Sequence, residues 1–316
     1  MVSDKTIELV VPAFNEERNL ERFYTEVARV FDTRLPELRW RVMFVDDGST
    51  DGSWPLLTDL ARKHDNVRAL RLNRNYGAHV AISAGMNAAE ANAVVIIAAD
   101  LQDPPATIEE FVRRWNEGHR VVWGVRAARQ EALHRRMFSR VFHLLVRRYA
   151  LPTYPSHGTG SFCLVDRSVV QNVRRMREDF RTIFGLIAIQ GYRAAEVPYV
   201  RVERQLGRSG WGLHKMLRTT LDVFTSYSHL PVRIITWVGL VSCLLALVGI
   251  VYQVVHWFFF ETLRGWTMLF AAVCFFGGVQ TLALGVLGEY VWRTFHEVKR
   301  RPLWFVDSAT FDLDVR

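Results

Sequence analysis

The fold is decided by residues 40–49, WRVMFVDDGS, where a short apolar strand runs directly into two carboxylates. Outward from this stretch, similar apolar runs occur at Ile7–Pro12, Val67–Leu72, Val94–Ala98 and Arg120–Gly124, and segments with helical spacing lie between them. Runs rich in Val and Ile are typical of strands buried on both faces. Strands that alternate with helices predict an α/β fold with a parallel, doubly wound sheet.

Carboxylates and amides follow several of these predicted strands. They are Asn15 and Glu16 after the first strand, Asp46 and Asp47 after the second, and Asp100 and Asp103 after the fourth. In a doubly wound sheet, ligands bind outside the carboxyl ends of the strands. A role in turns and helix caps is the alternative for each pair, but three groups at one edge favour a binding site.

The same loops indicate which chemistry this edge supports. The first strand is not followed by GxGxxG and no Walker-type loop occurs, which argues against a dinucleotide or P-loop enzyme. Carboxylates at strand ends suit Mg²⁺ or Mn²⁺ held against a diphosphate. Asp100 and Gln102, two apart in an extended segment, are expected to face the same way. Such a metal neutralises the charge on a departing nucleoside diphosphate.

The C-terminal third of the chain has a different composition. Two apolar runs, Ile234–Phe260 and Trp266–Trp292, are each about 27 residues long, enough for a helix to cross a hydrocarbon core of ~30 Å. Five residues, 261–265, separate them. The sequence therefore predicts a tight helical hairpin in a membrane.

The chain is thus expected to have four parts: a soluble α/β domain over 1–212, an amphipathic helix over 213–231, a transmembrane hairpin over 232–292 and a basic tail over 293–316. For 213–231, an ordinary surface helix is the alternative to one lying in the membrane interface. The net charge is +8, with basic residues outside both ends of the hairpin. This pattern favours anionic membrane lipids over nucleic acid as partners and places the α/β domain on the cytoplasmic face of the inner membrane.

Four ordered motifs carry a resemblance to a known family. They are VVPAFNEE at 10–17, VDDGSTD at 45–51, NRNYG at 73–77 and ADLQDPP at 99–105. Together they resemble the polyprenyl-phosphate glycosyltransferases of the second glycosyltransferase family, which include dolichol-phosphate mannose synthases and undecaprenyl-phosphate sugar transferases. The resemblance implies the nucleotide-sugar-binding, Rossmann-like sheet of the A-type glycosyltransferase fold. It also implies metal-dependent transfer of a sugar from a nucleoside-diphosphate sugar to polyprenyl phosphate.

The resemblance also implies roles for single residues on the donor side. It implies that Pro12, Phe14 and Glu16 contact the base and ribose of the sugar nucleotide, and that Asp46 and Asp47 lie beside them in the same site. It implies that Asp100 and Gln102 bind the metal ion and that Asp100 is a catalytic residue.

On the acceptor side, the resemblance places the lipid phosphate at Arg126, Arg135 and Ser139. Arg204 and Ser209 match a loop that closes over the diphosphate and count as catalytic. Two physical points agree with the phosphate assignments. Arginine offers a bidentate fork to phosphate oxygens, and residues 135 and 139, four apart, share one helix face. A solvated basic helix is the alternative for this arginine-rich stretch.

Two departures from the family pattern stand out. Ala98 occupies the position where many relatives carry the first Asp of the metal motif, and acidic residues that relatives carry near Gly158 and Ser161 are absent. A lipid phosphate is already an anion, so it needs no general base to remove a proton. We therefore expect direct displacement with inversion at the anomeric carbon. A catalytically impaired, membrane-anchored nucleotide-sugar-binding or scaffold protein is the alternative, with Ala98 as the mark of lost activity.

Two further expectations concern related enzymes and assembly. Processive polysaccharide synthases resemble this domain but usually carry Gln-x-x-Arg-Trp, which is absent here. Small residues in the second apolar run favour close helix packing: Gly277, Gly278, Ala283, Gly285 and Gly288. Some family members are tetramers, so the resemblance implies a homo-oligomer.

Overall fold

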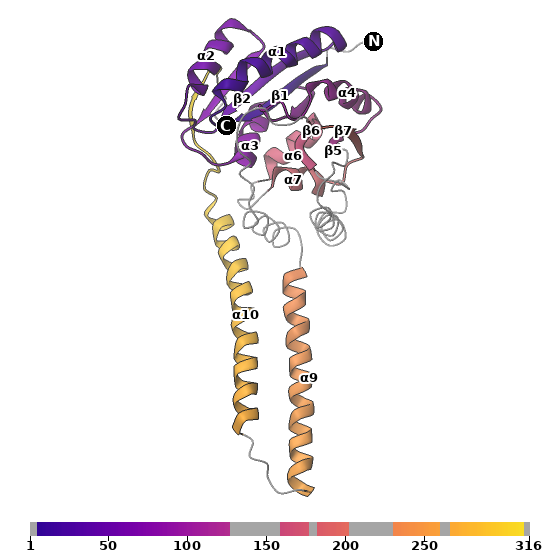
Figure 1. Cartoon of the computed structure of the whole chain (residues 1–316), viewed down its shortest axis with the longest axis vertical. Coiled ribbons are helices and arrows are strands. Elements are labelled where there is room, and N and C mark those ends of the chain that lie inside the picture. Colours follow the sequence, from indigo (N-terminus) through magenta and orange to yellow (C-terminus); the bar gives the residue numbers. More distant parts are fainter. Residues whose placement is uncertain (1–4, 127–158, 177–181, 202–229, 260–265, 313–316) are drawn as a thin grey trace. The chain divides into compact units, whose positions relative to one another are not determined.

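The computed structural model of the chain describes residues 5–126, 159–176, 182–201, 230–259 and 266–312 (Figure 1). Two compact units divide the chain. The first holds Met1–Met216 together with Arg301–Arg316, and the second holds Leu217–Arg300. The C-terminal segment thus belongs to the α/β unit, although the second unit precedes it in sequence.

One mixed sheet organises the first unit, and within the described residues its strand order is β7-β5-β6-β4-β1-β2-β3-β8. The strands are β1 (Thr6–Ala13), β2 (Arg39–Asp46), β3 (Val67–Leu72), β4 (Ala93–Ile96), β5 (Val121–Arg126), β6 (Thr159–Asp166), β7 (Ala194–Tyr199) and β8 (Val306–Ala309). Strands β1 to β4 are mutually parallel where they pair, and β5 pairs in parallel with β7. The predicted α/β class is confirmed.

The prediction of a purely parallel sheet is wrong at two strands. Strand β6 runs antiparallel to both β4 and β5, and β8 runs antiparallel to β3. The reason is that a strand's direction depends on the connection that leads into it, whereas its apolar pattern shows only that it is buried.

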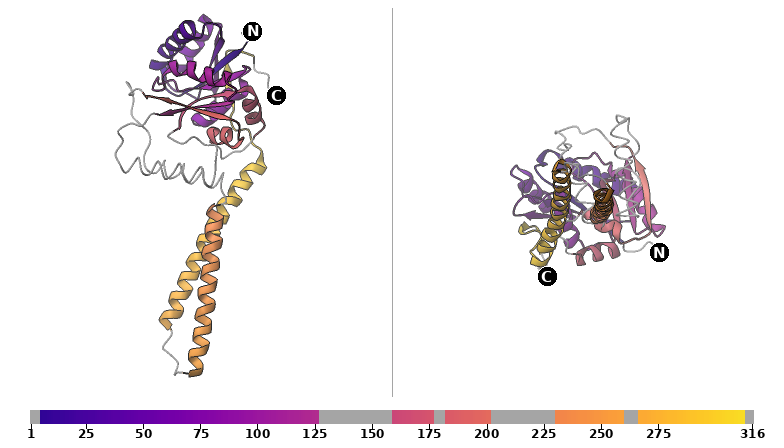
Figure 2. Two further views of the ribbon diagram at one scale, coloured as in Figure 1. Left: turned by 90° about the vertical axis from the view of Figure 1, so that its right-hand side faces the viewer. Right: turned by 90° about the horizontal axis from the view of Figure 1, so that it is seen from below.

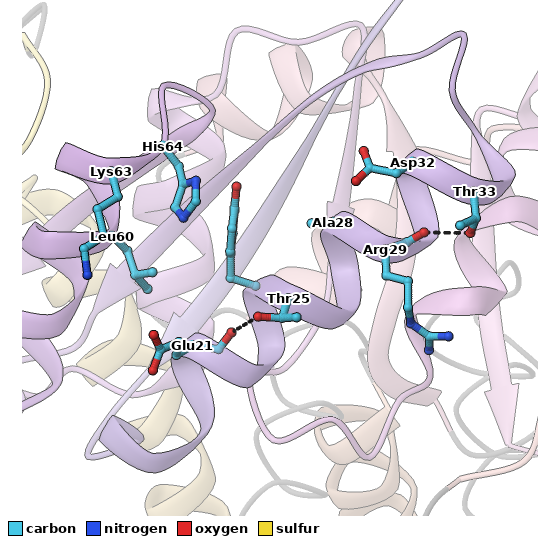
Figure 3. Close-up of a pocket in the computed structure, with 10 residues that line it drawn as sticks. Glu21, Thr25, Ala28, Arg29, Asp32, Thr33, Leu60, Lys63 and His64 are labelled. Atoms are coloured by element: carbon cyan, nitrogen blue, oxygen red, sulfur yellow. Dashed lines mark hydrogen bonds between the residues drawn. The ribbon is translucent and has the colours of Figure 1, made fainter.

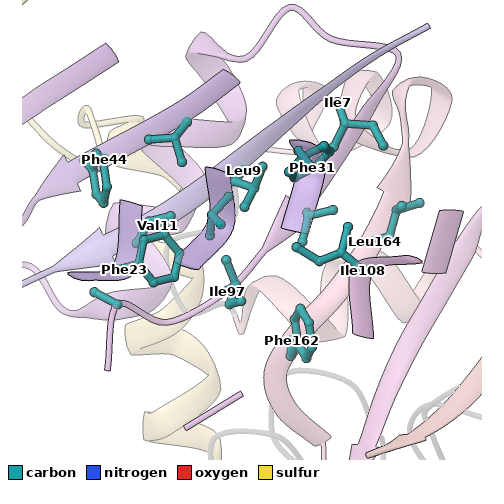
Figure 4. Packing of buried hydrophobic residues seen from close by; sticks show 14 of the residues in the cluster. Ile7, Leu9, Val11, Phe23, Phe31, Phe44, Ile97, Ile108, Phe162 and Leu164 are labelled. Carbon is teal, nitrogen blue, oxygen red and sulfur yellow. The ribbon is translucent and has the colours of Figure 1, made fainter. Parts of the chain in front are cut away.

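Helices cover both faces of this sheet. They are α1 (Glu17–Arg34), α2 (Ser53–Lys63), α3 (Ala78–Ala88), η1 (Pro105–Thr107), α4 (Ile108–Asn116), α6 (Arg167–Arg175) and α7 (Ile183–Ile189). The alternation of side chains along β1 explains the two layers. Leu9 faces the cluster that includes Phe23 of α1 (Figure 4), whereas Val10 faces α3. There, a Cβ added at Gly85 would lie 2.6 Å from a Val10 methyl carbon, so glycine allows α3 to lie against the sheet.

The second unit contains α9 (Leu230–Phe259) and α10 (Trp266–Lys299), which lie side by side (Figures 1 and 2). Their 30 and 34 residues correspond to about 45 and 51 Å of helix at 1.5 Å per residue. Large apolar side chains are exposed along both helices, among them Trp237, Leu244, Val273 and Leu284.

Counted over the described residues alone, no helix combines the length and the apolar character needed to cross a membrane. The two helices of the predicted hairpin are therefore present, but the described residues do not bear out that they span a bilayer. Their bounds also differ from the prediction, because α9 begins at Leu230 and α10 continues to Lys299. The predicted amphipathic helix lies outside the described residues except for its last two positions, which open α9.

The predicted basic tail, 293–316, is not one continuous tail. Its first residues complete α10, and Val306–Ala309 forms β8 at the edge of the sheet. The Asn73 N–H donates to the Phe305 carbonyl at 3.1 Å, and the Thr310 N–H donates to the Ala69 carbonyl at 3.0 Å. The prediction of a basic tail rested on the cluster of basic residues at 293–301 and overlooked residues 306–309, which pair with the edge of β3.

Candidate functional site

The predicted site residues that the structure describes lie at one edge of the sheet. This edge is formed by the carboxyl ends of β1, β2, β4, β5 and β7, which all point the same way because β6 is antiparallel to both of its neighbours. The loops that leave these strands contain residues 14–16, 46–50, 98–103, Arg126 and Arg201. This topology places the acidic residues that follow β1, β2 and β4 at the same edge of the sheet.

The loop after β1 is fixed by hydrogen bonds to the loop after β2. Asn15 adopts a left-handed backbone conformation with φ of 56°, for which Asn is well suited. Its N–H donates to the Ser49 hydroxyl at 2.9 Å, and its side-chain oxygen accepts from the Thr50 N–H at 2.9 Å. The Glu16 N–H donates to the Ser53 hydroxyl at 3.0 Å. Phe14 stays 43% exposed, so its ring is open to a ligand, while Pro12 is half-buried.

Asp46 is fully buried at the end of β2. One carboxylate oxygen accepts the Ser49 N–H at 3.0 Å, and the other lies 3.3 Å from Arg71 Nε. Gly48 completes this turn with φ of 70°, and a Cβ there would lie 2.6 Å from the backbone of Arg74. Asp46 therefore holds the loop in shape, which agrees with the turn-forming alternative better than with direct contact to a nucleotide.

Asp47 likewise holds a loop in shape, in this case the loop between β3 and α3. Its carboxylate accepts the N–H groups of Tyr76 at 2.8 Å and Gly77 at 2.7 Å. Burial raises the pKa of Asp47, and these two hydrogen bonds oppose the rise. Its own N–H donates to the Ala13 carbonyl at 2.8 Å. Asp47 thus joins the ends of β1 and β2 to the NRNYG motif in front of α3.

The loop after β4 contains the predicted metal ligands. Asp100 is half-buried and accepts the Gln102 N–H at 3.2 Å, and Gln102 is buried. Leu101 between them has φ of 54°, so the segment is a turn and the prediction that it is extended is wrong. Among the described residues, no group of three or more His, Cys, Asp or Glu side chains gathers in a way that holds a metal ion. One carboxylate with a neighbouring amide still matches the donor set of a Mg²⁺ or Mn²⁺ ion that takes its other ligands from water and a diphosphate.

Beside this loop lies a compact charged cluster. The Tyr199 hydroxyl donates to buried Asp103 at 2.5 Å, and Arg126 Nε lies 3.5 Å from the same hydroxyl. Burial raises the pKa of Asp103, although the charges of Arg126 and Arg201 favour its ionised form. Burial, followed by repulsion from Arg126, lowers the pKa of Arg201. The charges of two guanidinium groups thus act on one buried carboxylate, which leaves net positive charge that can attract phosphate oxygens.

Sequence reasoning missed two residues of this cluster, Tyr199 and Arg201. In the loop that begins with Arg201, the sequence predicts roles only for Arg204 and Ser209. No strand was predicted at residues 194–199, so the sequence had no signal that put Arg201 at the ligand-binding edge. Of the other predicted residues, Arg135, Ser139, Arg204 and Ser209 lie outside the described residues, so their roles stay predictions.

A surface pocket of about 460 Å³ lies elsewhere, between α1 and the end of α2 (Figure 3). Its lining includes Glu21, Arg29, Asp32 and His64. The Thr25 and Thr33 hydroxyls in it donate to carbonyls of their own helix. Because α2 ends there just before β3 begins, the pocket lies toward the amino ends of the strands. It is separate from the candidate site.

Comparison with known proteins now places this geometry in a family. Residues 8–174 match Glycosyl transferase family 2. The chain belongs to this family. It is similar to the uncharacterized glycosyltransferase sll0501 of Synechocystis, with 36% identity over 96% of each chain. It is also similar to the SfII prophage-derived bactoprenol glucosyl transferase of Shigella flexneri, with 33% identity over 96% of this chain and 98% of that one.

Among solved structures, the chain is similar to the mannosyltransferase PcManGT from Pyrobaculum calidifontis in complex with GDP-Man and Mn²⁺. The identity is 20%, the TM-score is 0.48, and the match covers 70% of this chain and 63% of that one. The protein is a family 2 glycosyltransferase related to bactoprenol glucosyl transferases. The expected enzyme class is confirmed.

Proposed function

We propose that this glycosyltransferase moves a sugar from a nucleoside-diphosphate sugar to a polyprenyl phosphate at the cytoplasmic face of the inner membrane. The observation that carries the proposal is the charged cluster of Asp103, Tyr199, Arg126 and Arg201 next to Asp100. Its positive charge would attract a phosphate acceptor and stabilise a diphosphate leaving group. The name of the related bactoprenol glucosyl transferase supports a polyprenyl acceptor.

On the donor side, the exposed ring of Phe14 offers a surface for the base, with Pro12 and Glu16 nearby in sequence. Asp100 and Gln102 would hold Mg²⁺ or Mn²⁺, which supplies charge neutralisation for the departing nucleoside diphosphate. Ala98 contributes no ligand, so this metal depends on water and on the diphosphate for most of its coordination.

The acceptor needs orientation more than activation. Arg126, with Arg135 and Ser139 of the predicted acceptor site, would hold the lipid phosphate. One phosphate oxygen attacks the anomeric carbon and forms the new glycosyl bond. The bond from that carbon to the diphosphate breaks, and its electron pair leaves with the nucleotide. No proton has to move from the acceptor, so positioning and electrostatics supply the catalysis and the configuration inverts.

The second unit would keep the enzyme at its lipid substrate. Exposed apolar side chains run along both α9 and α10, including Trp237, Val248, Leu269 and Leu287. Contiguous apolar surface of this kind marks a membrane or protein contact. We therefore propose that the unit anchors the enzyme as a membrane hairpin, and that its small residues support a homo-oligomer.

The test uses the full chain in detergent with Mn²⁺, radiolabelled UDP-glucose or GDP-mannose, and undecaprenyl phosphate. We expect label to pass into an organic extract, and an NMR assay of the product to show inverted configuration. Undecaprenol without its phosphate is the matched control and should accept no label. Release of free sugar without lipid labelling for every donor would refute the proposed acceptor, and retained configuration would refute the direct displacement.

A further inference from the structure

Arg71, on β3, makes contacts that the donor loops and the C-terminal segment share. Its Nε lies 3.3 Å from the buried carboxylate of Asp46, and its Nη2 donates to the Ser49 carbonyl at 3.3 Å. Its Nη1 lies 3.9 Å from a carboxylate oxygen of Asp307 on β8. The guanidinium also lies 5.7 Å from the ring of Trp54. One side chain thus joins the end of β2 to the edge strand at the end of the chain.

We propose that Arg71 is a positioning residue for donor binding and that β8 completes the donor site by holding Arg71 in place. This inference rests on the proposed function, because it concerns the nucleotide of the same donor. Arg71 would not contact the nucleotide itself. It acts through the loops after β1 and β2.

The Asp46 contact carries most of the effect. Asp46 is fully buried, and a buried carboxylate without a charged partner is strongly unfavourable. Without Arg71, this carboxylate would keep the Ser49 N–H but lose its nearby cation. It would then move toward water, and this movement disturbs the loop.

The disturbance has a defined path to the donor. Ser49 is held by Asp46 through its N–H and by Arg71 through its carbonyl. Its hydroxyl in turn accepts the Asn15 N–H. Asn15 follows the exposed ring of Phe14. A shift of Ser49 therefore moves the loop on which the base is expected to lie.

Strand β8 contributes in two ways of different strength. Its backbone pairing covers the edge of β3, with Leu70 opposite Ala309 and Arg71 opposite Ser308. Asp307 adds a charge, but its side chain is 52% exposed, and exposed ion pairs contribute little. We expect the strand to matter more than this one carboxylate. The segment after α10 would then support Arg71 mainly through the backbone pairing of β8 with β3.

The test measures nucleotide affinity by calorimetry on the full chain in detergent, with UDP, GDP, ADP and CDP each in the presence of Mn²⁺. We expect Arg71→Ala to weaken binding of the preferred nucleotide about tenfold. We expect Arg71→Lys to weaken it about threefold, because an ammonium cannot reach three partners at once. Asp307→Asn should change affinity by no more than about twofold. In the sugar-transfer assay the donor KM should rise with the same order, while kcat at saturating donor stays within about twofold.

The control is Arg68→Ala. Arg68 lies on the same strand and contacts the C-terminal segment through Phe311, at 5.3 Å from the ring centroid. It is three positions from Arg71 and so faces the other side of the sheet. This variant should lower the melting temperature without changing nucleotide affinity. If Arg71→Ala does not fold, Arg71→Gln is used instead. Glutamine keeps an N–H group that can donate a hydrogen bond but has no charge, so we expect the same loss of nucleotide affinity.

The outcomes separate the two proposals. If the wild type binds a nucleotide and neutral Arg71 variants bind it equally well, the inference is overturned and the proposed function stands. If Arg68→Ala weakens binding as much as Arg71→Ala, the effect is general destabilisation and the inference is also overturned. If the wild type binds none of the four nucleotides, the proposed function fails and the inference fails with it.

Discussion

The two halves of the candidate site are built on opposite principles. In the half formed by β1, β2 and β3, the polar groups of Asn15, Asp46, Asp47 and Ser49 bond to one another or to backbone groups. In the half formed by β4, β5 and β7, the charges of two arginines, Arg126 and Arg201, act on the buried carboxylate of Asp103 beside half-buried Asp100. The first half is shaped before a ligand arrives, whereas the second keeps charge available for one.

This difference has a measurable consequence. Substitutions in the β1–β3 half should change stability and donor KM, because they remove hydrogen bonds that shape the loops. Substitutions in the β4–β7 half should change turnover with little cost in stability, because their charges serve a ligand. A substitution that shows the opposite behaviour in either half would contradict this division.

The largest effect is expected for Asp100→Asn. The variant keeps the side-chain shape and an oxygen that accepts the Gln102 N–H, but it loses the charge proposed to hold the metal. We expect kcat to fall about 10³-fold, measured as lipid-linked label at saturating Mn²⁺. Asp100 is repelled by Asp103, so the melting temperature should stay unchanged or rise slightly. A large drop in melting temperature would place Asp100 with the structural half and contradict the division.

Next comes Arg126→Ala, for which we expect a loss of about 10²-fold in kcat/KM for the polyprenyl phosphate. Tyr199→Phe is the matched control, because it removes the hydroxyl 3.5 Å from Arg126 Nε and leaves both charges in place. It should cost less than tenfold in the same assay. If Tyr199→Phe is as damaging as Arg126→Ala, the arginine serves to support the cluster and not to bind the acceptor.

The sequence predicted the elements of this division better than their roles. Apolar runs followed by acidic residues identified β1, β2 and β4 and their common edge, because strands buried on both faces are rich in Val and Ile. The same pattern did not separate Asp46, which is fully buried, from Asp100, which is half-buried. Both follow a strand, and only the packing around them decides which carboxylate reaches solvent.

Other features were beyond sequence reasoning for a related reason. Strand β8 is separated from its partner β3 by more than two hundred residues, and Arg71 gains its importance only when Asp307 and Asp46 meet on either side of it. Long-range pairing of this kind has no local signal. Arg201 was missed because no strand was predicted at residues 194–199, and only β7 of the structure places this arginine at the ligand-binding edge.

In the β1–β3 half, the third prediction concerns Asp47→Asn. An amide accepts one N–H but presents its own NH₂ to the other, so one of the hydrogen bonds to Tyr76 and Gly77 is lost. We expect the free energy of unfolding to fall by about 1–3 kcal/mol, measured by chemical denaturation, with a higher donor KM. An unchanged stability together with a large fall in kcat would move Asp47 to the catalytic half.

The same carboxyl also gives the stability a pH dependence. Because burial raises the pKa of Asp47 in the folded state, its contribution is greatest below its ordinary pKa of about 3.9 and is lost as the pH rises through the raised value. The stability advantage of the wild type over Asp47→Asn should therefore shrink as the pH rises from about 4. An advantage that grows over this range would show that the hydrogen bonds outweigh burial.

The smallest effect is expected for Ser49→Ala, which tests whether the β1–β3 half acts through shape alone. The variant removes the hydroxyl that accepts the Asn15 N–H and leaves the backbone bonds of Ser49 to Asp46 and Arg71 in place. A single neutral hydrogen bond contributes about 1 kcal/mol, so the free energy of unfolding should fall by about that amount. The donor KM should rise no more than about fivefold with kcat unchanged. Thr58→Ala is the control, since its hydroxyl donates only within α2, to the Trp54 carbonyl, and its donor KM should match the wild type. If Ser49→Ala lowers kcat and leaves KM alone, the loop takes part in the transition state, and shape fixed in advance is then not what separates this half from the other.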